Sequence, residues 1–285
     1  MKKSLFVLAA IFFSFINYTF AQCSDAGICS LGGHSIEQKT NTFDLSIGYS
    51  YGYSGKEDDI AYSSVKLNGL IYFTADTKFN VITPYNFQSG PLGNVNGIGD
   101  LIISLSQSYT IYESRLTFSA GLKFATGDEN KEPSLPLAYQ NGLGTNDLLL
   151  GIDYSFSNFT FGIGYQLAGK RNENSQTYLK RGDDLLIRGE YTFIIEKFNI
   201  NPQLLFIKRI SKSNVLYNGT LPESHFFDVD GSDHSQLNLL ISTFYEINNM
   251  HSLFLEAAVP LLERDINIDG LKRTFTISTR LSFGF

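Results

Sequence analysis

Apolar and polar residues alternate one by one along much of this chain. In the segment 101–111 apolar residues occupy most alternate positions, and serine and threonine fill most of the others. The segment 115–124 repeats the scheme, with Leu, Phe and Ala alternating with Arg, Thr, Ser, Gly and Lys. A period of two places one kind of residue on each face of an extended strand. The pattern predicts strands, and after the N-terminal region we find no sustained helical period and no apolar run of 18 residues.

About twelve segments follow this pattern, each about nine to fifteen residues long. Strands of soluble domains cluster near five or six residues, whereas a tilted strand needs roughly nine to eleven to cross a bilayer. The predicted strands are therefore long enough to span a membrane. They cover 43–53, 65–75, 77–85, 99–112, 114–126, 146–157, 158–169, 183–195, 198–210, 235–247, 251–262 and 271–285.

The connections between these segments alternate between short and long. Short ones lie near residues 76, 113, 158, 197 and 249, and the others are long and rich in Gly, Asn, Asp, Ser and Pro. Outer-membrane barrels have short periplasmic turns, long external loops and an even number of strands. We therefore expect an all-β fold, a transmembrane antiparallel up-and-down β-barrel of about twelve strands in the outer membrane of a Gram-negative cell. The long connections cover 54–64, 86–98, 127–145, 170–182, 211–234 and 263–270.

The first residues have the features of an export signal. Lys2 and Lys3 precede a short apolar run, and the small residue Ala21 suits cleavage. We expect a cleaved signal peptide at 1–21, a periplasmic N-terminal segment at 22–42 and the barrel at 43–285. In an oxidising compartment the two cysteines, Cys23 and Cys29, are predicted to form a disulfide. Lipidation at Cys23 is disfavoured, because Gln22 is not the small residue that such a site requires.

If the apolar faces of the strands contact lipid, the opposite faces point into the barrel. Charges of both signs fall on these inward positions, where they can pair with one another or meet water. They are candidates for setting solute selectivity, and an alternative is a paired network that holds a closed barrel together. The lumen-facing charged candidates are Arg115, Lys123, Asp153, Arg188, Glu190, Arg209, Glu246, Glu256 and Arg280.

Aromatic residues concentrate near the ends of the predicted strands. The chain has 16 Tyr, 24 Phe and no Trp. Interfacial aromatic girdles of this kind are typical of membrane barrels, and we expect Tyr49, Tyr72, Tyr109 and Tyr154 among others to belong to them. The last strand alternates up to the terminal Phe285, which resembles the strand that outer-membrane barrels present to their insertion machinery.

Composition excludes one class of partner. The formal net charge is −6 and charged residues make up 18% of the chain. Nucleic-acid binding requires a basic surface, which this chain does not offer in bulk. The expected partners are membrane lipid, the outer-membrane insertion machinery and a small-molecule solute that remains unidentified.

Three motifs resemble a particular family of outer-membrane proteins. They are GIGD at 97–100, LKFATGD at 122–128 and NGLGTNDLLLGIDYSF at 141–156. The chain resembles the family labelled "MetA-pathway of phenol degradation", described as transporters, although Ala125 stands where that family usually has Pro. The resemblance implies a barrel that passes small solutes, apolar or aromatic ones among them, and it carries over no binding residues.

The barrel is predicted to be a passive channel or transporter without enzymatic activity. One alternative is a closed structural or adhesive barrel that displays its loops. A membrane-embedded hydrolase is disfavoured, because the pair His225 and His234 lies on a long loop that would hold catalytic geometry poorly.

The same loop carries an acidic motif. Asp228, Asp230 and Asp233 surround Gly231 and could supply oxygen ligands to calcium. The spacing departs from that of an EF-hand, so the favoured interpretation is a solvated acidic loop, and no cofactor is otherwise expected.

Overall fold

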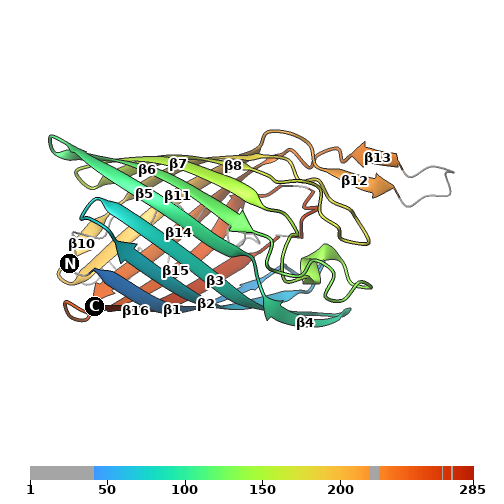
Figure 1. Cartoon of the computed structure of the whole chain (residues 1–285), viewed down its shortest axis with the longest axis horizontal. Coiled ribbons are helices and arrows are strands. Elements are labelled where there is room, and N and C mark those ends of the chain that lie inside the picture. Colours follow the sequence, from blue (N-terminus) through green and yellow to red (C-terminus); the bar gives the residue numbers. More distant parts are fainter. Residues whose placement is uncertain (1–41, 218–224, 265, 271) are drawn as a thin grey trace, which may run out of the picture.

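The computed structural model describes residues 42–217, 225–264, 266–270 and 272–285, and twelve of its strands close into one antiparallel barrel (Figure 1). Each barrel strand pairs with its neighbours along the chain, and β16 pairs with β1 to complete the wall. The predicted signal peptide and the cysteine pair lie outside the described residues. The barrel strands are β1 (Phe43–Tyr53), β2 (Ala61–Tyr72), β3 (Thr77–Gly90), β5 (Leu101–Ile111), β6 (Ser114–Phe124), β7 (Asp147–Phe156), β8 (Phe159–Leu167), β9 (Asp184–Tyr191), β11 (Phe198–Arg209), β14 (Ser235–Glu246), β15 (His251–Leu262) and β16 (Phe275–Gly284).

The first and last strands close the wall in continuous register. The pairs run from Asp44 opposite Gly284 to Tyr53 opposite Phe275. The terminal residue extends the ladder, because the backbone N–H of Phe285 donates to the carbonyl oxygen of Phe43 at 2.8 Å. Closure leaves no unpaired strand edge among the twelve, which a barrel needs where no water can satisfy backbone groups.

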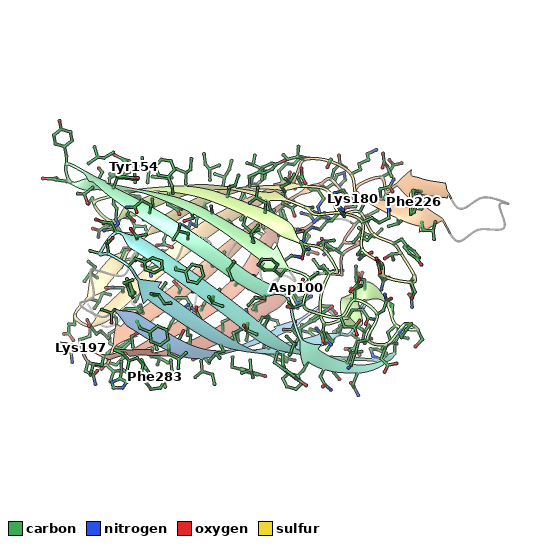
Figure 2. The ribbon with its side chains drawn as sticks, in the orientation of Figure 1. Asp100, Tyr154, Lys180, Lys197, Phe226 and Phe283 are labelled. Carbon is green, nitrogen blue, oxygen red and sulfur yellow. The ribbon has the colours of Figure 1, made fainter. Side chains whose placement is uncertain are left out.

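The side chains of the wall are inverted relative to those of a soluble globule. Large apolar side chains project outward from the strands and are exposed (Figure 2). The buried side chains of the same strands include Ser46, Ser104, Asn201 and Ser242. This is the arrangement of a barrel of the outer-membrane type, which contacts lipid with its outer face. The outward positions include Ile47, Leu67, Phe118, Ile152, Ile163, Ile187, Leu204, Ile241, Leu255 and Ile277.

No helix within the described ranges is long and apolar enough to cross a membrane.

The aromatic residues only partly follow the predicted girdle. Tyr49, Tyr109 and Tyr154 are exposed on the outer wall. Tyr72 is an exception, since its hydroxyl group donates to Asp44 Oδ2 at 2.9 Å in a part-buried position. Asp44 and Tyr72 both occupy inward positions, so the prediction that Tyr72 belongs to the girdle is wrong.

Three predicted boundaries differ from the structure. The stretch 86–98, expected to be a loop, continues β3 as far as Gly90 and returns as β4 (Gly93–Ile98). The turn depends on Gly93, whose φ of 152° favours glycine. The loop 211–234 contains a second hairpin, β12 (Asn214–Tyr217) with β13 (His225–Asp228). The predicted strand 183–195 divides into β9 and the short β10 (Phe193–Ile195), which also pairs with β11.

The short connections lie where the sequence predicts them. Tyr112, Ser157 and Glu196 adopt positive φ values of 55°, 50° and 54° in these turns, as tight connections between antiparallel strands often require. Phe43 and Phe285 lie at this end of the barrel, which we call the turn end. The opposite end, where the long connections gather, is the loop end (Figure 1).

The connections at the loop end pack together into a cap. The loop 127–145 contains the 3₁₀ helix η2 (Leu137–Tyr139), and both end residues of this helix are buried. Tyr139 packs in an apolar cluster with residues at the loop ends of β2 and β4, and Leu137 packs in a second cluster with residues of two other loops. The cap therefore has its own apolar contacts and lies over the entrance to the lumen. The first cluster contains Ile60, Tyr62, Val95 and Tyr139, and the second contains Leu137, Leu143, Leu179 and Val215.

Candidate functional site in the barrel lumen

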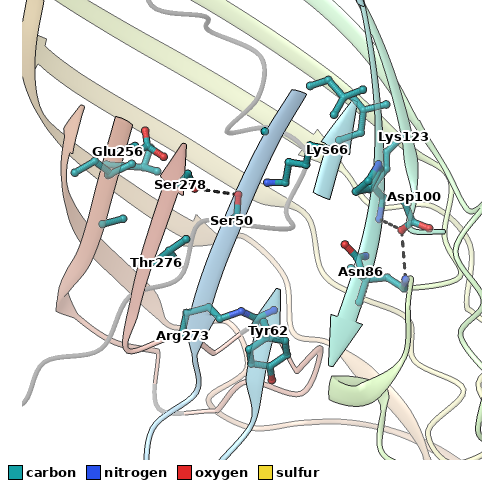
Figure 3. A pocket seen from close by; sticks show the side chains of 18 of the residues that line it. Ser50, Tyr62, Lys66, Asn86, Asp100, Lys123, Glu256, Arg273, Thr276 and Ser278 are labelled. Atoms are coloured by element: carbon teal, nitrogen blue, oxygen red, sulfur yellow. Dashed lines mark hydrogen bonds and ion pairs between the residues drawn. The ribbon is translucent and has the colours of Figure 1, made fainter. Parts of the chain in front are cut away.

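The main cavity of the described structure lies inside the barrel (Figure 3). Its volume is about 320 Å³, and inward side chains of strands on both sides of the barrel line it. The loop 127–145 contributes Leu137, Ala138 and Asn141, so the cap forms one boundary of the cavity. The volume falls within the roughly 300–1,000 Å³ of small-molecule sites.

Part of the cavity wall is apolar. Leu186 of β9, Leu205 of β11, Leu240 of β14 and Ala258 of β15 line the cavity, and they belong to one buried apolar cluster against which Ile102 of β5 packs. These residues interrupt the polar pattern of the inward positions. The lumen therefore offers a surface to an apolar group as well as to water.

Many other residues of the cavity wall are polar. Ser50 of β1, Lys66 of β2, Glu256 of β15 and Arg280 of β16 all line it. Ser278 Oγ donates to Ser50 Oγ at 3.0 Å, and this hydrogen bond links the inward faces of β16 and β1 (Figure 3). Charged groups of both signs thus face the same space.

A charged pair spans three strands of the lumen. Asp153 of β7 and Arg188 of β9 both lie opposite Gly162 of β8 in the register, and Arg188 Nη2 contacts Asp153 Oδ1 at 2.5 Å. The glycine makes this contact possible, because a Cβ atom at position 162 would lie 2.2 Å from Asp153 Oδ1. Two charged side chains can therefore meet over an inward glycine of the strand between them.

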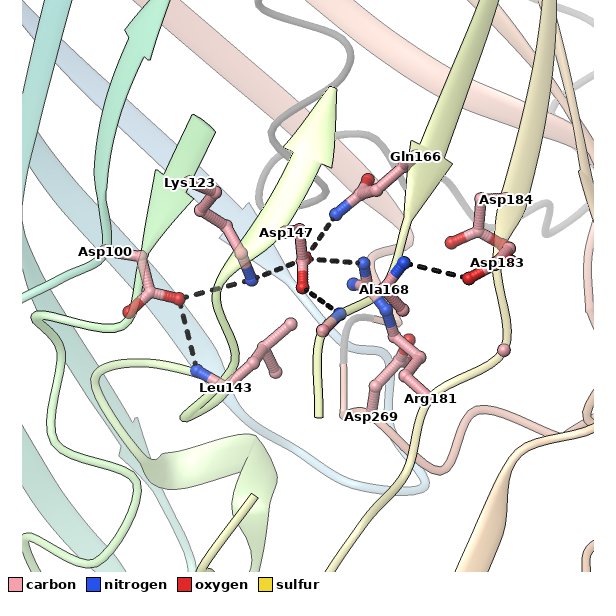
Figure 4. A network of polar contacts seen from close by, with 12 residues as sticks. Asp100, Lys123, Leu143, Asp147, Gln166, Ala168, Arg181, Asp183, Asp184 and Asp269 are labelled. Atoms are coloured by element: carbon pink, nitrogen blue, oxygen red, sulfur yellow. Dashed lines mark hydrogen bonds and ion pairs between the residues drawn. The ribbon is translucent and has the colours of Figure 1, made fainter. Parts of the chain in front are cut away.

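Two ionic networks hold the cap to the barrel wall, and the first centres on Asp147 (Figure 4). Asp147 Oδ2 lies 3.0 Å from Lys123 Nζ and 2.9 Å from Arg181 Nη2. Lys123 Nζ lies 3.4 Å from Asp100 Oδ2, and the backbone N–H groups of Gly127 and Leu143 donate to Asp100 at 3.1 and 3.3 Å. Because these amides belong to the loop 127–145, the network fixes that loop over the lumen.

The second network centres on Arg209. Its guanidinium lies 3.1 Å from Asp184 Oδ1 and 2.7 Å from Asp269 Oδ2, and Arg264 lies 3.5 Å from Asp184 Oδ1. Burial alone would raise the pKa of Asp269, but the guanidinium groups of Arg209, Arg264 and Arg181 lower it below its ordinary value. The carboxylate therefore stays ionised and holds the loop 263–270 against β11.

The nine charged residues predicted to face the lumen occupy several environments. Lys123, Asp153, Arg188, Glu256 and Arg280 line the cavity. Glu190 and Arg209 are buried on inward positions of β9 and β11. Arg115 is half-buried near the turn end, where it pairs with Asp76 at 3.0 Å.

The remaining predicted residue, Glu246, does not reach the cavity. It ends β14 at the turn end, and its side chain is exposed. Its inward parity is correct, but the strand ends there, so the prediction that it faces the lumen is wrong.

Several important residues were not among the predicted candidates. Lys66, Asp147 and Asp184 lie on inward positions of predicted strands, so their parity alone could have identified them. Arg181 and Asp269 lie in loops, where no periodic pattern indicates which way a side chain points. Their roles depend on how the cap folds.

The acidic loop does not bring its three carboxylates together. Within the part of the chain that the structure describes, no three His, Cys, Asp or Glu side chains form a group suited to a metal ion. Asp230 is exposed and pairs with Lys212 at 2.6 Å, and Asp228 accepts a hydrogen bond from Asn214 Nδ2 at 3.0 Å. Calcium binding at Asp228, Asp230 and Asp233 stays an untested prediction.

Comparison with known proteins supports the fold. No family model matches the chain. No curated protein matches it either. Among solved structures, an outer membrane channel from Pseudomonas putida F1 is similar, with a TM-score of 0.63 and 12% identity over 88% of this chain and 99% of that chain. The NanC porin has a TM-score of 0.49 and 12% identity, over 85% of this chain and 98% of its own. At 12% identity the likeness to the Pseudomonas putida F1 channel concerns the fold, and it agrees with the observed outer-membrane type of barrel.

Proposed function

We propose that the protein is an outer-membrane channel through which small solutes pass passively. The observation that carries this proposal is the cavity of about 320 Å³ inside a wall whose outer face is apolar. Because polar and charged side chains line this cavity, water can enter it, whereas the outer face suits hydrocarbon. A polar lumen inside a lipid-facing wall is the physical arrangement that a channel requires.

The dimensions support small solutes rather than large ones. Barrels of eight strands are filled by their side chains, and those of sixteen or more leave a wide aqueous channel. Twelve strands lie between these limits, and the loop 127–145 narrows the lumen further. Ala138 and Asn141 of this loop border the cavity on its loop side.

The sequence motifs give a narrower form of the proposal. GIGD, LKFATGD and NGLGTNDLLLGIDYSF resemble the "MetA-pathway of phenol degradation" family, which implies solutes that are small and apolar or aromatic. The apolar cluster on the lumen wall is compatible with such solutes. Membership of that family stays a proposal that rests on these motifs.

A closed barrel that displays its loops is the second candidate function. The hairpin of β12 and β13 favours it, since this hairpin projects beyond the other strands at the loop end (Figure 1). Under this alternative the two ionic networks would keep the cap shut. The two functions differ in whether ions cross the barrel.

Conductance across a planar bilayer tests the proposal. We expect the purified full chain to insert and give discrete conductance steps. Asn68→Trp places a bulky group on an inward position that lines the cavity, and should lower the step size several-fold. Val65→Trp, on the outer face of the same strand, should leave the step size unchanged. A folded barrel that inserts without steps at any voltage would contradict the channel and favour the closed barrel.

A further inference from the structure

Two cationic side chains flank an inward glycine on three adjacent strands. Gly48 of β1 lies opposite Arg280 of β16 on one side and opposite Lys66 of β2 on the other. Neighbouring strands are about 4.8 Å apart, so the two cations start from backbones roughly 10 Å apart on either side of the glycine. All three residues line the lumen cavity.

The glycine leaves the wall free of a side chain between the two cations. A Cβ atom at position 48 would lie 3.1 Å from the carbonyl oxygen of Thr279 and 3.6 Å from Cβ of Arg280. The strands therefore approach closely here, and no inward group of β1 separates Lys66 from Arg280. In Figure 3 Lys66 points into the cavity on the side where Ser50 and Glu256 also lie.

The pair of Asp153 and Arg188 shows that two side chains flanking an inward glycine leave room for a carboxylate over that glycine. There, too, two charged side chains flank an inward glycine, and a carboxylate meets a guanidinium over Gly162 at 2.5 Å. In the row of Arg280, Gly48 and Lys66 both flanking groups are cations. Neither has a carboxylate within the 4.0 Å ion-pair distance in the described structure. A carboxylate from outside the chain could therefore take the position that an acidic residue occupies over Gly162.

The contacts of the two cations leave donors for such a carboxylate. The guanidinium of Arg280 lies over the ring of Phe254, with its carbon 4.6 Å from the ring centroid, and its buried Nε has no hydrogen-bond partner in the described structure. Lys66 makes no hydrogen bond or ion pair to any residue in the described ranges. A buried polar group without a partner is unfavourable, and a charge-assisted hydrogen bond would remove that cost.

Among the described residues, one carboxylate of the cavity wall interacts with this row. Glu256 of β15 lines the same cavity and attracts Arg280 over a longer distance. Most other charged groups on the cavity wall are in ion pairs: Lys123 with Asp100 and Asp147, Arg188 with Asp153, and Asp269 with Arg209. The cation Arg273 also lines the cavity, and its guanidinium lies over the ring of Tyr62 and donates to the carbonyl oxygens of Gly270 and Lys272. Two cations against one carboxylate leave an excess of positive charge at this row, which favours a singly charged anion.

The apolar part of the cavity wall determines what the rest of the solute can be. Leu186, Leu205, Leu240 and Ala258 present an apolar surface to the same space. A solute anchored at its anionic end by Lys66 and Arg280 can place an apolar body against these residues and remove both surfaces from water.

We propose that the lumen binds small organic carboxylates with an apolar body, through Lys66 and Arg280 at the carboxylate and the leucine side at the body. This proposal rests on the proposed channel function, since it names the solute class of that channel. The polar row gives charge selectivity, and the apolar side distinguishes such solutes from small hydrophilic anions.

Calorimetric titration of the full chain in detergent with benzoate tests the site. The wild type should bind benzoate, and Lys66→Gln or Arg280→Gln should weaken binding about tenfold or more, since each removes a charged partner. Lys66→Arg keeps the charge and should keep most of the affinity. Lys197→Gln, an exposed lysine at the turn end labelled in Figure 2, is the matched control and should bind like the wild type.

Three further ligands show whether binding depends on the negative charge, on the apolar body or on both. Acetate has no apolar body and benzyl alcohol has no charge, so both should bind at least tenfold more weakly than benzoate. Benzylamine should not bind better than benzoate. Tighter binding of benzylamine would make Glu256 the anchor and overturn the proposal, and so would equal affinity of the wild type and both glutamine variants for benzoate.

Benzoate binding and bilayer conductance test the binding site and the channel separately. Benzoate binding without conductance steps would leave the site standing and contradict the channel. Conductance steps without benzoate binding would contradict the site and leave the channel standing.

Discussion

Asp269 links the loop end of the barrel to its wall through a fully buried carboxylate. Its Oδ2 atom contacts the guanidinium of Arg209 at 2.7 Å, and Asp184 shares that guanidinium. Breaking a buried ion pair by removing one partner costs about 3–5 kcal/mol, because the other charge is left without compensation. Individual residues of this kind determine whether the cap stays over the lumen.

Asp269→Asn should therefore loosen the cap at neutral pH. Asp184 still compensates part of the charge of Arg209, so we expect a loss near the lower end of the range of about 3–5 kcal/mol. Hydrogen exchange followed by mass spectrometry should show faster exchange in the loop 263–270. Asp230→Asn removes an exposed partner of Lys212 and should leave exchange unchanged. Equal protection in Asp269→Asn and the wild type would show that the network does not hold the cap.

The same carboxylate predicts a pH dependence. The pKa of Asp269 is lower in the folded protein than its ordinary value, so its stabilising effect is present above about pH 4, the unfolded pKa. It is lost progressively as the pH falls below that value. After correction for the intrinsic pH dependence of exchange, protection of 263–270 should decrease below about pH 4 in the wild type. Asp269→Asn should lack this part of the decrease, and the same decrease in both proteins would assign it to other groups.

Individual strands show clearly what the sequence could predict. The alternation in 114–126 and 251–262 predicted β6 and β15 to within two residues, because one face of each strand meets lipid and the other meets the lumen. Beyond the membrane-spanning wall this alternation no longer applies, and there the prediction fails. Gln88 lies in a segment predicted to be a loop, yet it belongs to β3, because β3 extends beyond the wall to pair with β4.

The site was predictable to a similar extent. Lys123, Asp153 and Arg188 were identified because their strands fix the direction of their side chains. The partners of Lys123 were missed for different reasons. Asp147 lies on an inward position of a predicted strand, so its parity could have identified it, whereas Asp100 lies in the connection between β4 and β5. Glycine carries no polarity, so the roles of Gly48 and Gly162 depend on the cross-strand register, which the alternation of one strand does not contain.

Strand β2 gives a direct test of the assignment of faces. Lys66 points into the lumen, and its neighbour Leu67 is exposed on the outer face. The exchange Lys66→Leu with Leu67→Lys keeps the composition and reverses the two faces. A lysine facing hydrocarbon near the bilayer midplane costs about 2–4 kcal/mol, so denaturant-induced unfolding in lipid vesicles should show a loss of this size. The single variant Lys66→Leu keeps an apolar outer face, so its free energy of unfolding should decrease much less. Equal stability of the exchanged variant and the wild type would contradict the assigned faces.

The barrel as a whole separates hydrocarbon from water. Hydrocarbon surrounds the wall, and water occupies the lumen, where Lys66 and Arg280 face an apolar side of the same cavity. The cap is packed by apolar contacts and held by ionic networks, so it narrows this space without belonging to the wall. Passage, selectivity and the position of the candidate binding site all follow from that separation.

Tryptophan fluorescence measures this separation most directly, because the chain contains no native Trp. Phe118→Trp places the reporter on the outer face of β6, and Phe254→Trp places it on the inner face of β15, at a buried position that lines the cavity. In vesicles of lipids with brominated acyl chains, we predict strong quenching of the reporter at 118 and little quenching of the reporter at 254. Equal quenching of both, or stronger quenching at 254, would contradict a lipid-facing wall around an aqueous lumen.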